Sequence, residues 1–266
     1  MNVFTTVVAA IGIASPLAAQ WINYPTPGIP RTPEGKPNLT APAPKTADGK
    51  PDLSGIWDME HESQPTQLAG QYTGAPEMGN MGSSIKEGLP YTLWAAELMR
   101  ARVTENRVND PLSSCLPLSV PRLHAFNAPK RIVQSPSILL LAYEYNAMYR
   151  QIMLDGRALP VDPNPSWLGY STGKWEGDTL VVQTTGFRDG LWLDNSGNPL
   201  TDSGKITERF HRVNFGQLEI DVTVVDPKAY TKPWTVKLKQ RIVPDTELLE
   251  YICLENEKSV GHMEKK

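Results

Sequence analysis

Carboxylate and guanidinium groups lie close together in one short stretch of the sequence. Glu144 follows Tyr143, Arg150 comes six residues after Glu144, and Asp155 and Arg157 flank a glycine. Strict alternation gives Glu144 apolar neighbours on its strand face, so its carboxylate needs a partner, and Arg150 or Arg157 is the nearest. Such a pair can bind a ligand or, if burial raises the carboxyl pKa, act as an acid or base. It can equally do no more than hold strands together.

A second candidate group lies in the loop 189–202, which is rich in glycine and asparagine. Within this loop, Trp192 stands two residues before Asp194. An exposed indole beside a carboxylate is a common ligand-contacting pair, but the indole could equally close one end of a barrel.

A third group is the charged strand 207–212. Alternation places Arg209 and His211 on one face of this strand, and Glu208 and Arg212 on the other. His211 could act as a base, or Glu208 and Arg212 could form a pair that lines a barrel. A solvated outer face would show the same pattern.

Aromatic side chains support a ligand pocket. The sequence contains seven Trp and nine Tyr against five Phe, and these amphipathic rings suit a pocket for a mixed polar and apolar ligand. The candidate catalytic residues are Glu144, Asp155, Asp194 and His211. The candidate ligand contacts are Tyr143, Tyr145, Arg150, Arg157, Trp167, Tyr170, Trp192 and Arg209.

Two better-known kinds of site are disfavoured. The segment 169–173 matches the Gly-x-Ser-x-Gly nucleophile motif, but that motif needs Ser171 at the start of a helix, and a β-run follows here. The four histidines are scattered, with no pair at the spacing of metal ligands. The sequence therefore predicts neither a metal site nor a cofactor.

Strands must position these side chains. From Arg131 to Asn256 the apolar pattern has a period of two and is broken by turn residues, which predicts eight to ten short antiparallel strands. This number fits a closed, mainly β, antiparallel barrel, and a two-sheet sandwich is the alternative. One helix is expected at residues 90–107, packed through an apolar stripe made of Leu93, Trp94, Ala96, Leu98 and Met99.

Residue composition predicts how the rest of the chain is organised. Residues 1–20 resemble a signal peptide cleaved near Ala19 and Gln20, and no later run is apolar enough to span a membrane. Residues 21–52 form a proline-rich arm with an internal repeat, read as ordered and anchored by Leu39 and Leu53, or else as a disordered leader. A single domain at 53–258, with a flap at 64–88, and a charged tail at 259–266 complete the organisation.

Charge and cysteines bear on compartment and partners. A formal net charge of −3 without a basic block disfavours nucleic acid as a partner. The two cysteines, Cys115 and Cys253, allow one bridge in an oxidising compartment, and two buried free thiols are the alternative. We therefore expect a secreted protein and favour the periplasm.

Four segments, Pro51–Trp57, Cys115–Arg122, Trp175–Val182 and Tyr251–Glu257, resemble a family of uncharacterised secreted proteins from acidobacteria and some proteobacteria. The resemblance extends over nearly the whole mature chain. It implies secretion and brings no catalytic residue.

The Gly-x-Trp at Gly55–Trp57, followed by a long meander, also resembles the start of lipocalin-like barrels. That resemblance implies an apolar ligand cavity, although the arm and the helix before the meander depart from the lipocalin pattern. The favoured function is binding of a small, partly apolar molecule, such as an aromatic, terpenoid or lipid-like compound. The alternatives are a cofactor-free lyase, isomerase or hydrolase that uses carboxylate and arginine groups, and an envelope structural or interaction protein. The sequence does not indicate the oligomeric state.

Overall fold

The computed structural model describes residues 25–60 and 80–255. The expected signal peptide, most of the expected flap and the charged tail lie outside these ranges. Among the described residues, no helix is long and apolar enough to cross a membrane.

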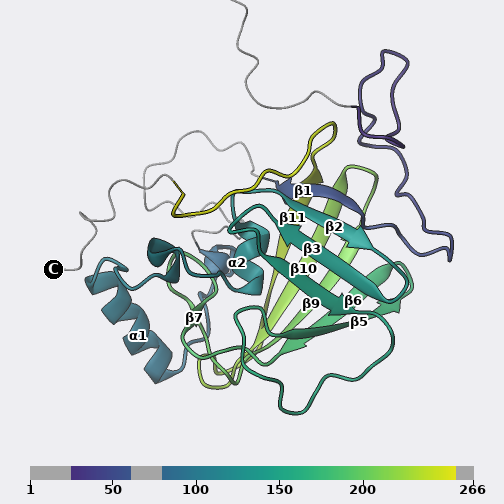
Figure 1. The fold of residues 1–266 in the computed structure, drawn as a ribbon. Coiled ribbons are helices and arrows are strands. Elements are labelled where there is room, and N and C mark those ends of the chain that lie inside the picture. The colour runs from purple at the N-terminus through teal and green to yellow at the C-terminus, as the bar shows by residue number, and fades with distance from the viewer. Residues whose placement is uncertain (1–24, 61–79, 256–266) are drawn as a thin grey trace, which may run out of the picture.

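Nine strands close into the predicted barrel, so the alternative of a sandwich is wrong (Figure 1). Around the barrel their order is β1-β11-β10-β9-β6-β5-β4-β3-β2. The nine strands are β1 (Gly55–Met59), β2 (Lys130–Gln134), β3 (Ile138–Tyr143), β4 (Tyr149–Met153), β5 (Tyr170–Glu176), β6 (Thr179–Thr185), β9 (Lys205–Arg212), β10 (Gln217–Val225) and β11 (Trp234–Ile242). A separate two-stranded sheet joins β7 (Leu191–Trp192) to β8 (Pro199–Leu200).

One seam of the barrel departs from the antiparallel prediction. Strands β4 and β5 run parallel and pair only at Ile152 with Ser171 and at Met153 with Thr172, whereas the eight other strand pairs are antiparallel. A long connection between the two strands returns the chain in the same direction, which a tight hairpin cannot do. The barrel wall therefore has few backbone hydrogen bonds between β4 and β5, and the first residues of β4 have no paired partner in β5.

Alternate strand positions point into the barrel and fill it. Leu141, Val182, Phe210, Ile220 and Leu238 come from five different strands, and each is completely buried in one continuous core. The parity predicted for β9 is confirmed, because its even-numbered residues are buried. The interior is therefore a packed core that also contains several polar side chains.

The helices only partly match the prediction. Helix α1 (Leu93–Thr104) forms as expected and begins at Thr92, whose hydroxyl accepts from Ala95 N. Its apolar stripe does not pack as predicted, since Leu93 is 87% and Trp94 48% exposed and Ala95 is the one buried residue of the helix. A second, unpredicted helix, α2 (Val120–Ala125), is buried at all six positions and contacts inward-pointing side chains of β9 and β11. It lies across one end of the barrel (Figure 1). Two short 3₁₀ turns, η1 (Met81–Ser84) and η2 (Pro111–Ser114), complete the helical elements.

The arm is ordered over its described residues and follows its repeat. Thr32 N donates to Lys36 O and Thr46 N to Lys50 O, each at 2.8 Å, so the two repeat units form equivalent turns. The arm joins the β9–β10 turn because Gly216 N donates to Leu39 O at 2.8 Å. Leu53 is completely buried as predicted, whereas the side chain of Leu39 is 39% exposed.

The predicted disulfide between Cys115 and Cys253 forms. The period-two pattern predicts a last strand at residues 248–256, with Cys253 in it, but the described part of this segment forms no strand. Instead the disulfide fastens a C-terminal segment, residues 243–255, which also contacts the barrel through hydrogen bonds such as Val243 N to Ile56 O and Leu249 N to Glu144 Oε1, each at 2.8 Å. Residues 243–255 have no free strand edge at β11 to pair with, because β11 already pairs with both β1 and β10.

Candidate functional site

Five polar side chains form a continuous network inside the barrel, here called the interior network. Arg150 of β4 spans the inner wall, donating from NH1 to Glu208 Oε1 at 3.1 Å, from Nε to Ser171 Oγ at 3.1 Å and from NH2 to Thr184 Oγ1 at 2.8 Å. On the other side of Glu208, His124 Nε2 lies 2.7 Å from Oε1. All five residues are at most 2% exposed. The network thus joins β4, β5, β6, β9 and α2 across the core.

The charges of the interior network are set by burial and by the salt bridge. Burial raises the pKa of the Glu208 carboxyl, but Arg150 and His124 outweigh it and lower that pKa to about 2. Burial lowers the pKa of His124 to about 4, against the opposing pull of Glu208, so the imidazole is neutral at pH 7. A neutral ring that donates Nε2–H to Glu208 carries its free lone pair on Nδ1.

Two buried polar atoms beside the interior network are incompletely satisfied. Among the described residues, His124 Nδ1 has no hydrogen bond, and Tyr143 Oη has no bond of ordinary geometry although the Arg150 guanidinium lies close enough to interact with it as a donor. Arg150 and Glu208 both act electrostatically on the Tyr143 hydroxyl, and burial raises the pKa of that phenol. Unpaired buried atoms are rare in folded proteins and mark positions where water, an ion or a ligand group can bind.

Lowering the pH from 7 toward 4 is expected to destabilise the barrel through His124. Its pKa is about 4 in the folded protein, below the ordinary value, so the unfolded chain binds the proton more readily. The contribution is complete above pH 6.5 and is lost as the pH falls toward 4, by about 3 kcal/mol. Urea unfolding at each pH measures it.

The matched variants for this measurement are His124→Gln and His211→Gln. A glutamine at 124 keeps an N–H donor for Glu208 but does not titrate, so the slope of stability against pH should flatten between pH 6.5 and 4. His211 is exposed on the outer face of β9, and its replacement should leave the slope as in the wild type. Equal slopes in all three proteins would contradict the assignment.

A pocket opens in the barrel wall at the weak seam between β4 and β5. This wall pocket has a volume of about 420 Å³. Its lining combines aromatic, thioether and other apolar side chains with a few polar residues: Pro117, Met148, Tyr149, Arg150, Gln151, Met153, Ser166, Trp167, Leu168, Gly169, Tyr170 and Ser171. Arg150 and Ser171 also belong to the interior network, so the wall pocket and the network share two residues. The Arg150 side chain is only 1% exposed, so the network itself is closed off from solvent.

Local backbone geometry holds the rim of the wall pocket in place. Gly169 has φ +65°, and a Cβ at this position would meet Thr185 O at 2.6 Å. The loop before β5 can therefore lie against β6 only with glycine at this point. The Arg188 guanidinium lies 4.4 Å from the centre of the Trp167 ring and fixes the orientation of the indole.

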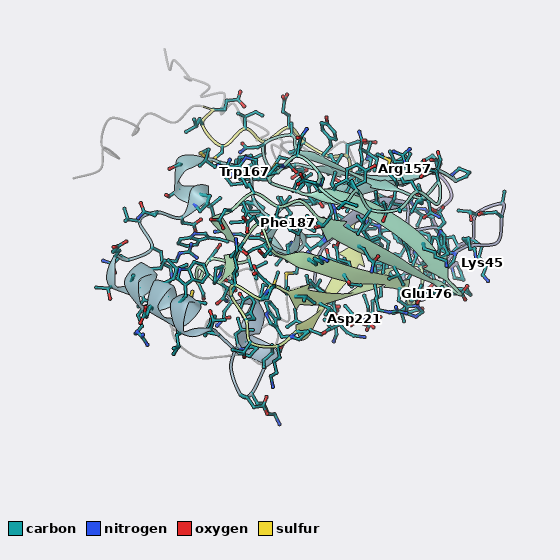
Figure 2. All side chains as sticks on the ribbon, turned by 90° about the horizontal axis from the view of Figure 1, so that it is seen from below. Lys45, Arg157, Trp167, Glu176, Phe187 and Asp221 are labelled. Carbon is teal, nitrogen blue, oxygen red and sulfur yellow. A yellow bond between two sulfur atoms is a disulfide. The ribbon has the colours of Figure 1, made fainter. Side chains whose placement is uncertain are left out.

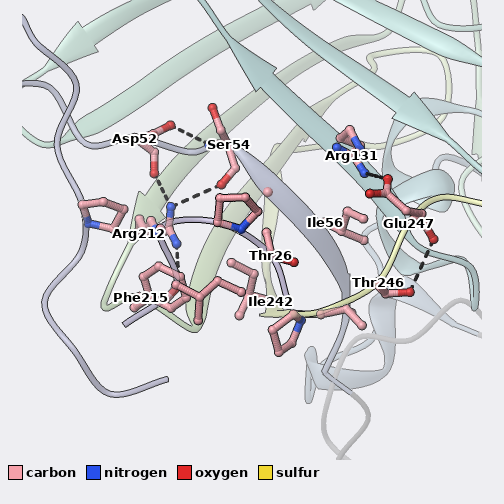
Figure 3. Close-up of a pocket in the computed structure, with 17 residues that line it drawn as sticks. Thr26, Asp52, Ser54, Ile56, Arg131, Arg212, Phe215, Ile242, Thr246 and Glu247 are labelled. Atoms are coloured by element: carbon pink, nitrogen blue, oxygen red, sulfur yellow. Dashed lines mark hydrogen bonds and ion pairs between the residues drawn. The ribbon is translucent and has the colours of Figure 1, made fainter. Parts of the chain in front are cut away.

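A second pocket, of about 420 Å³, lies between the arm and the barrel (Figure 3). Its polar centre is Arg212, which donates to the carbonyl oxygens of Asp52 and Phe215 and stacks 4.9 Å from the centre of the Trp57 ring. At its rim Arg131 pairs with Glu247 at 2.5 Å. These groups are occupied in fastening the arm and the C-terminal segment to the barrel, so we favour the wall pocket as the ligand site.

The structure brings together only some of the predicted site residues. Arg150, Trp167 and Tyr170 meet at the wall pocket, and Tyr143 points into the interior beside the network. Arg157 lies well away from Trp167 (Figure 2) in an exposed pair with Asp155, but it also donates to Tyr170 Oη at 3.2 Å and so stands beside one residue of the wall pocket.

Glu144 does not pair with either arginine as expected. Its carboxylate accepts a hydrogen bond from Leu249 N at 2.8 Å, while Arg150 binds Glu208. The Glu208–Arg212 pair that the sequence allowed does not form either, because all three guanidinium nitrogens of Arg212 donate to backbone carbonyls. Proximity in the sequence did not predict the partners of these charged side chains, because barrel closure brings together residues from strands that are far apart in the sequence.

The other predicted residues have local structural contacts. Asp194 is completely buried and accepts from Met81 N at 2.7 Å and Gly197 N at 3.1 Å, so it fastens its own loop to η1. Trp192 stacks under Arg102 at 4.4 Å, and Tyr145 donates to Leu116 O at 3.0 Å. Arg209 and His211 point outward, with Arg209 paired to Glu176 at 3.0 Å.

Sequence reasoning missed His124 and Lys130 altogether. Lys130 is completely buried, and its Nζ donates to Gln240 Oε1. The alternation of β2 carried a signal for it, because Lys130 shares the inward parity of Ile132. His124 had no such signal, since α2 is too short to show a helical period.

No family model matches the sequence, and no curated protein or solved structure matches it either.

Proposed function

We propose that this chain is a secreted protein that binds a small, partly apolar molecule in the wall pocket. The observation that carries the proposal is the lining of that pocket, where Trp167, Tyr149, Tyr170 and Met153 surround a cavity of about 420 Å³. This volume lies within the usual range for small-molecule sites, which are mostly apolar with a few polar groups.

The lining also indicates the shape and polarity of the ligand. Indole and phenol rings favour a flat aromatic or terpenoid skeleton, because such rings stack on planar and aliphatic surfaces. Thioethers adapt to irregular shapes, which suits the side of the pocket formed by Met148 and Met153. The Arg150 guanidinium is already bonded to Glu208, Ser171 and Thr184, so the pocket does not present a free positive charge. A neutral ligand with one hydrogen-bonding group therefore fits best.

Secretion is supported by the disulfide and by the N-terminal sequence. A bridge between Cys115 and Cys253 persists in an oxidising compartment such as the periplasm. The apolar run before Ala19 has the length of a signal-peptide core.

Replacing Trp167 with alanine is expected to weaken binding of the neutral aromatic probe N-phenyl-1-naphthylamine. Removing a stacked ring from a pocket costs about 1–3 kcal/mol, so the dissociation constant should rise about tenfold or more. The fluorescence of the probe, titrated with wild-type and variant protein, measures this change.

Trp94→Ala is the matched control. Trp94 is 48% exposed on α1, outside the wall pocket, and its loss should leave probe affinity unchanged. The proposal fails if wild-type protein does not bind the probe, or if the two variants lose affinity equally.

A second candidate function, a cofactor-free enzyme, is favoured by one specific observation. His124 is neutral and its Nδ1 carries an unpaired lone pair beside a buried ion pair, which is the arrangement of a general base. The residues that sequence analysis offered for such chemistry, Asp155 and Asp194, do not approach it. An enzyme would therefore use His124 and Glu208, with Tyr143 as a proton donor.

A further inference from the structure

The Lys130 amine is unusual among the charged groups of this protein. Lys130 is completely buried on β2, and Nζ donates to the neutral amide of Gln240, with no carboxylate in ion-pair contact among the described residues. Its inward cross-strand neighbours are Trp57 and Tyr143. Burial lowers the pKa of the amine to about 7, against a weaker opposing pull from Asp58.

A purely structural role explains Lys130 poorly. A buried ammonium without a counter-ion destabilises a fold, and an apolar side chain of similar length, such as methionine, would remove that cost. Groups that reduce stability without an evident packing gain are characteristic of functional sites.

The groups around Lys130 can move protons. Gln240, which accepts from the amine, donates from Nε2 to the carbonyl oxygen of His124 at 3.1 Å, so the lysine and the histidine are held by one amide. His124 and Lys130 also interact electrostatically. His124 Nδ1 is unpaired among the described residues and is a proton acceptor. Tyr143 Oη faces the Arg150 guanidinium, which can only donate, so the phenol keeps its own O–H as a proton donor.

We propose that Lys130 is a reactive amine that condenses reversibly with the carbonyl group of a small aldehyde or ketone inside the barrel. The Nζ lone pair attacks the carbonyl carbon, and the carbonyl oxygen takes a proton from Tyr143 Oη. His124 Nδ1 accepts a proton from nitrogen, which leaves a neutral carbinolamine. The carbinolamine hydroxyl then takes that proton from His124 and leaves as water, while the remaining N–H proton returns to the Tyr143 oxygen. Amine plus carbonyl compound thus gives imine plus water, with both residues restored and no oxidant or reductant.

The entry route must open transiently, because Lys130 is sealed in this structure. Two elements that enclose the barrel interior are short and could open for this. Helix α2 has six residues, and β4 pairs with β5 at two positions. The inference does not depend on ligand binding in the wall pocket, so the two proposals can fail separately.

The test is reductive trapping of folded protein at pH 7 with butanal and sodium cyanoborohydride, followed by peptide mapping. A pKa of about 7 leaves about half of the amine neutral, against roughly one in 2,500 for an ordinary exposed lysine. We expect N-butyl-Lys130 to exceed the label on exposed lysines such as Lys205 and Lys239 by about tenfold or more. Label confined to exposed lysines and the chain terminus would overturn the proposal.

Variants and unfolding provide the controls. Lys239→Met, on the outer face of β11, should leave the Lys130 label unchanged, whereas Lys130→Arg should abolish it while keeping a charge. Unfolding in urea before labelling should equalise all lysines. A preference for Lys130 that survives unfolding would show that local sequence, rather than the barrel, activates it, and would also overturn the proposal.

The melting temperature of Lys130→Met gives a second measurement. If the lysine is kept for reactivity, this variant should melt above the wild type at pH 7, since the buried amine destabilises the fold. The gain should shrink as the pH rises from 7 toward 10, because the wild-type amine is neutral there in the folded state. A variant that melts lower at every pH would show that Lys130 is structural.

Discussion

Replacing Glu208 with glutamine is expected to lower the free energy of unfolding by about 3–5 kcal/mol. Glu208 is completely buried, pairs with Arg150 and accepts from His124, so its loss leaves a buried guanidinium without a counter-ion. The side chain keeps its volume in this variant, so packing is preserved and the change is electrostatic. Urea unfolding, with an m-value close to that of the wild type, measures it.

Glu144→Gln is the matched control for this prediction. Glu144 is 8% exposed and accepts one hydrogen bond, from Leu249 N at 2.8 Å, which a glutamine oxygen can also accept. Its loss should cost about 1 kcal/mol or less. Equal losses in the two variants would show that Glu208 has no special role in the interior network.

Replacing Cys115 and Cys253 together with alanine is expected to lower the free energy of unfolding by up to about 5 kcal/mol. The cysteines are 138 residues apart, so the bridge closes a loop that contains most of the barrel strands. A loop of that length removes much of the conformational entropy of the unfolded chain. Urea unfolding of the oxidised wild type and the double variant measures the difference.

The same variant should loosen one segment of the folded state. Residues 243–255 then remain attached through contacts such as Asn146 N to Tyr251 O at 2.7 Å and Cys253 N to Asn146 Oδ1 at 2.9 Å, both near the former bridge. Amide exchange should accelerate in this segment and stay slow in β9, β10 and β11. Unchanged stability together with unchanged exchange would contradict a stabilising role for the disulfide.

The barrel could be predicted because period-two alternation acts over whole strands. The inward positions of β9 followed directly from parity. Two features lacked a local signal. The parallel contact between β4 and β5 depends on how a long connection returns, and α2 contains Pro121, Arg122 and His124, polar or helix-limiting residues that do not resemble a core helix.

The site was harder to predict because its partners are far apart in the sequence. Arg150 was expected to pair with Glu144 nearby in the sequence, but its carboxylate partner, Glu208, is 58 residues away and is brought to it only by barrel closure. The aromatic lining was partly found through Trp167 and Tyr170, which stand near the β5 strand. Lys130 was not predicted as a buried or functional residue, because a lysine at the start of a strand usually faces solvent.

Native mass spectrometry of the wild-type protein, purified gently from the cells that make it, would reveal whether the wall pocket holds a ligand. We expect an adduct of a single small organic molecule that disappears on denaturation and is greatly reduced in Trp167→Ala, while Trp94→Ala retains it. The bare mass of the mature chain in the wild type, or an adduct that persists unchanged in Trp167→Ala, would contradict binding in the wall pocket.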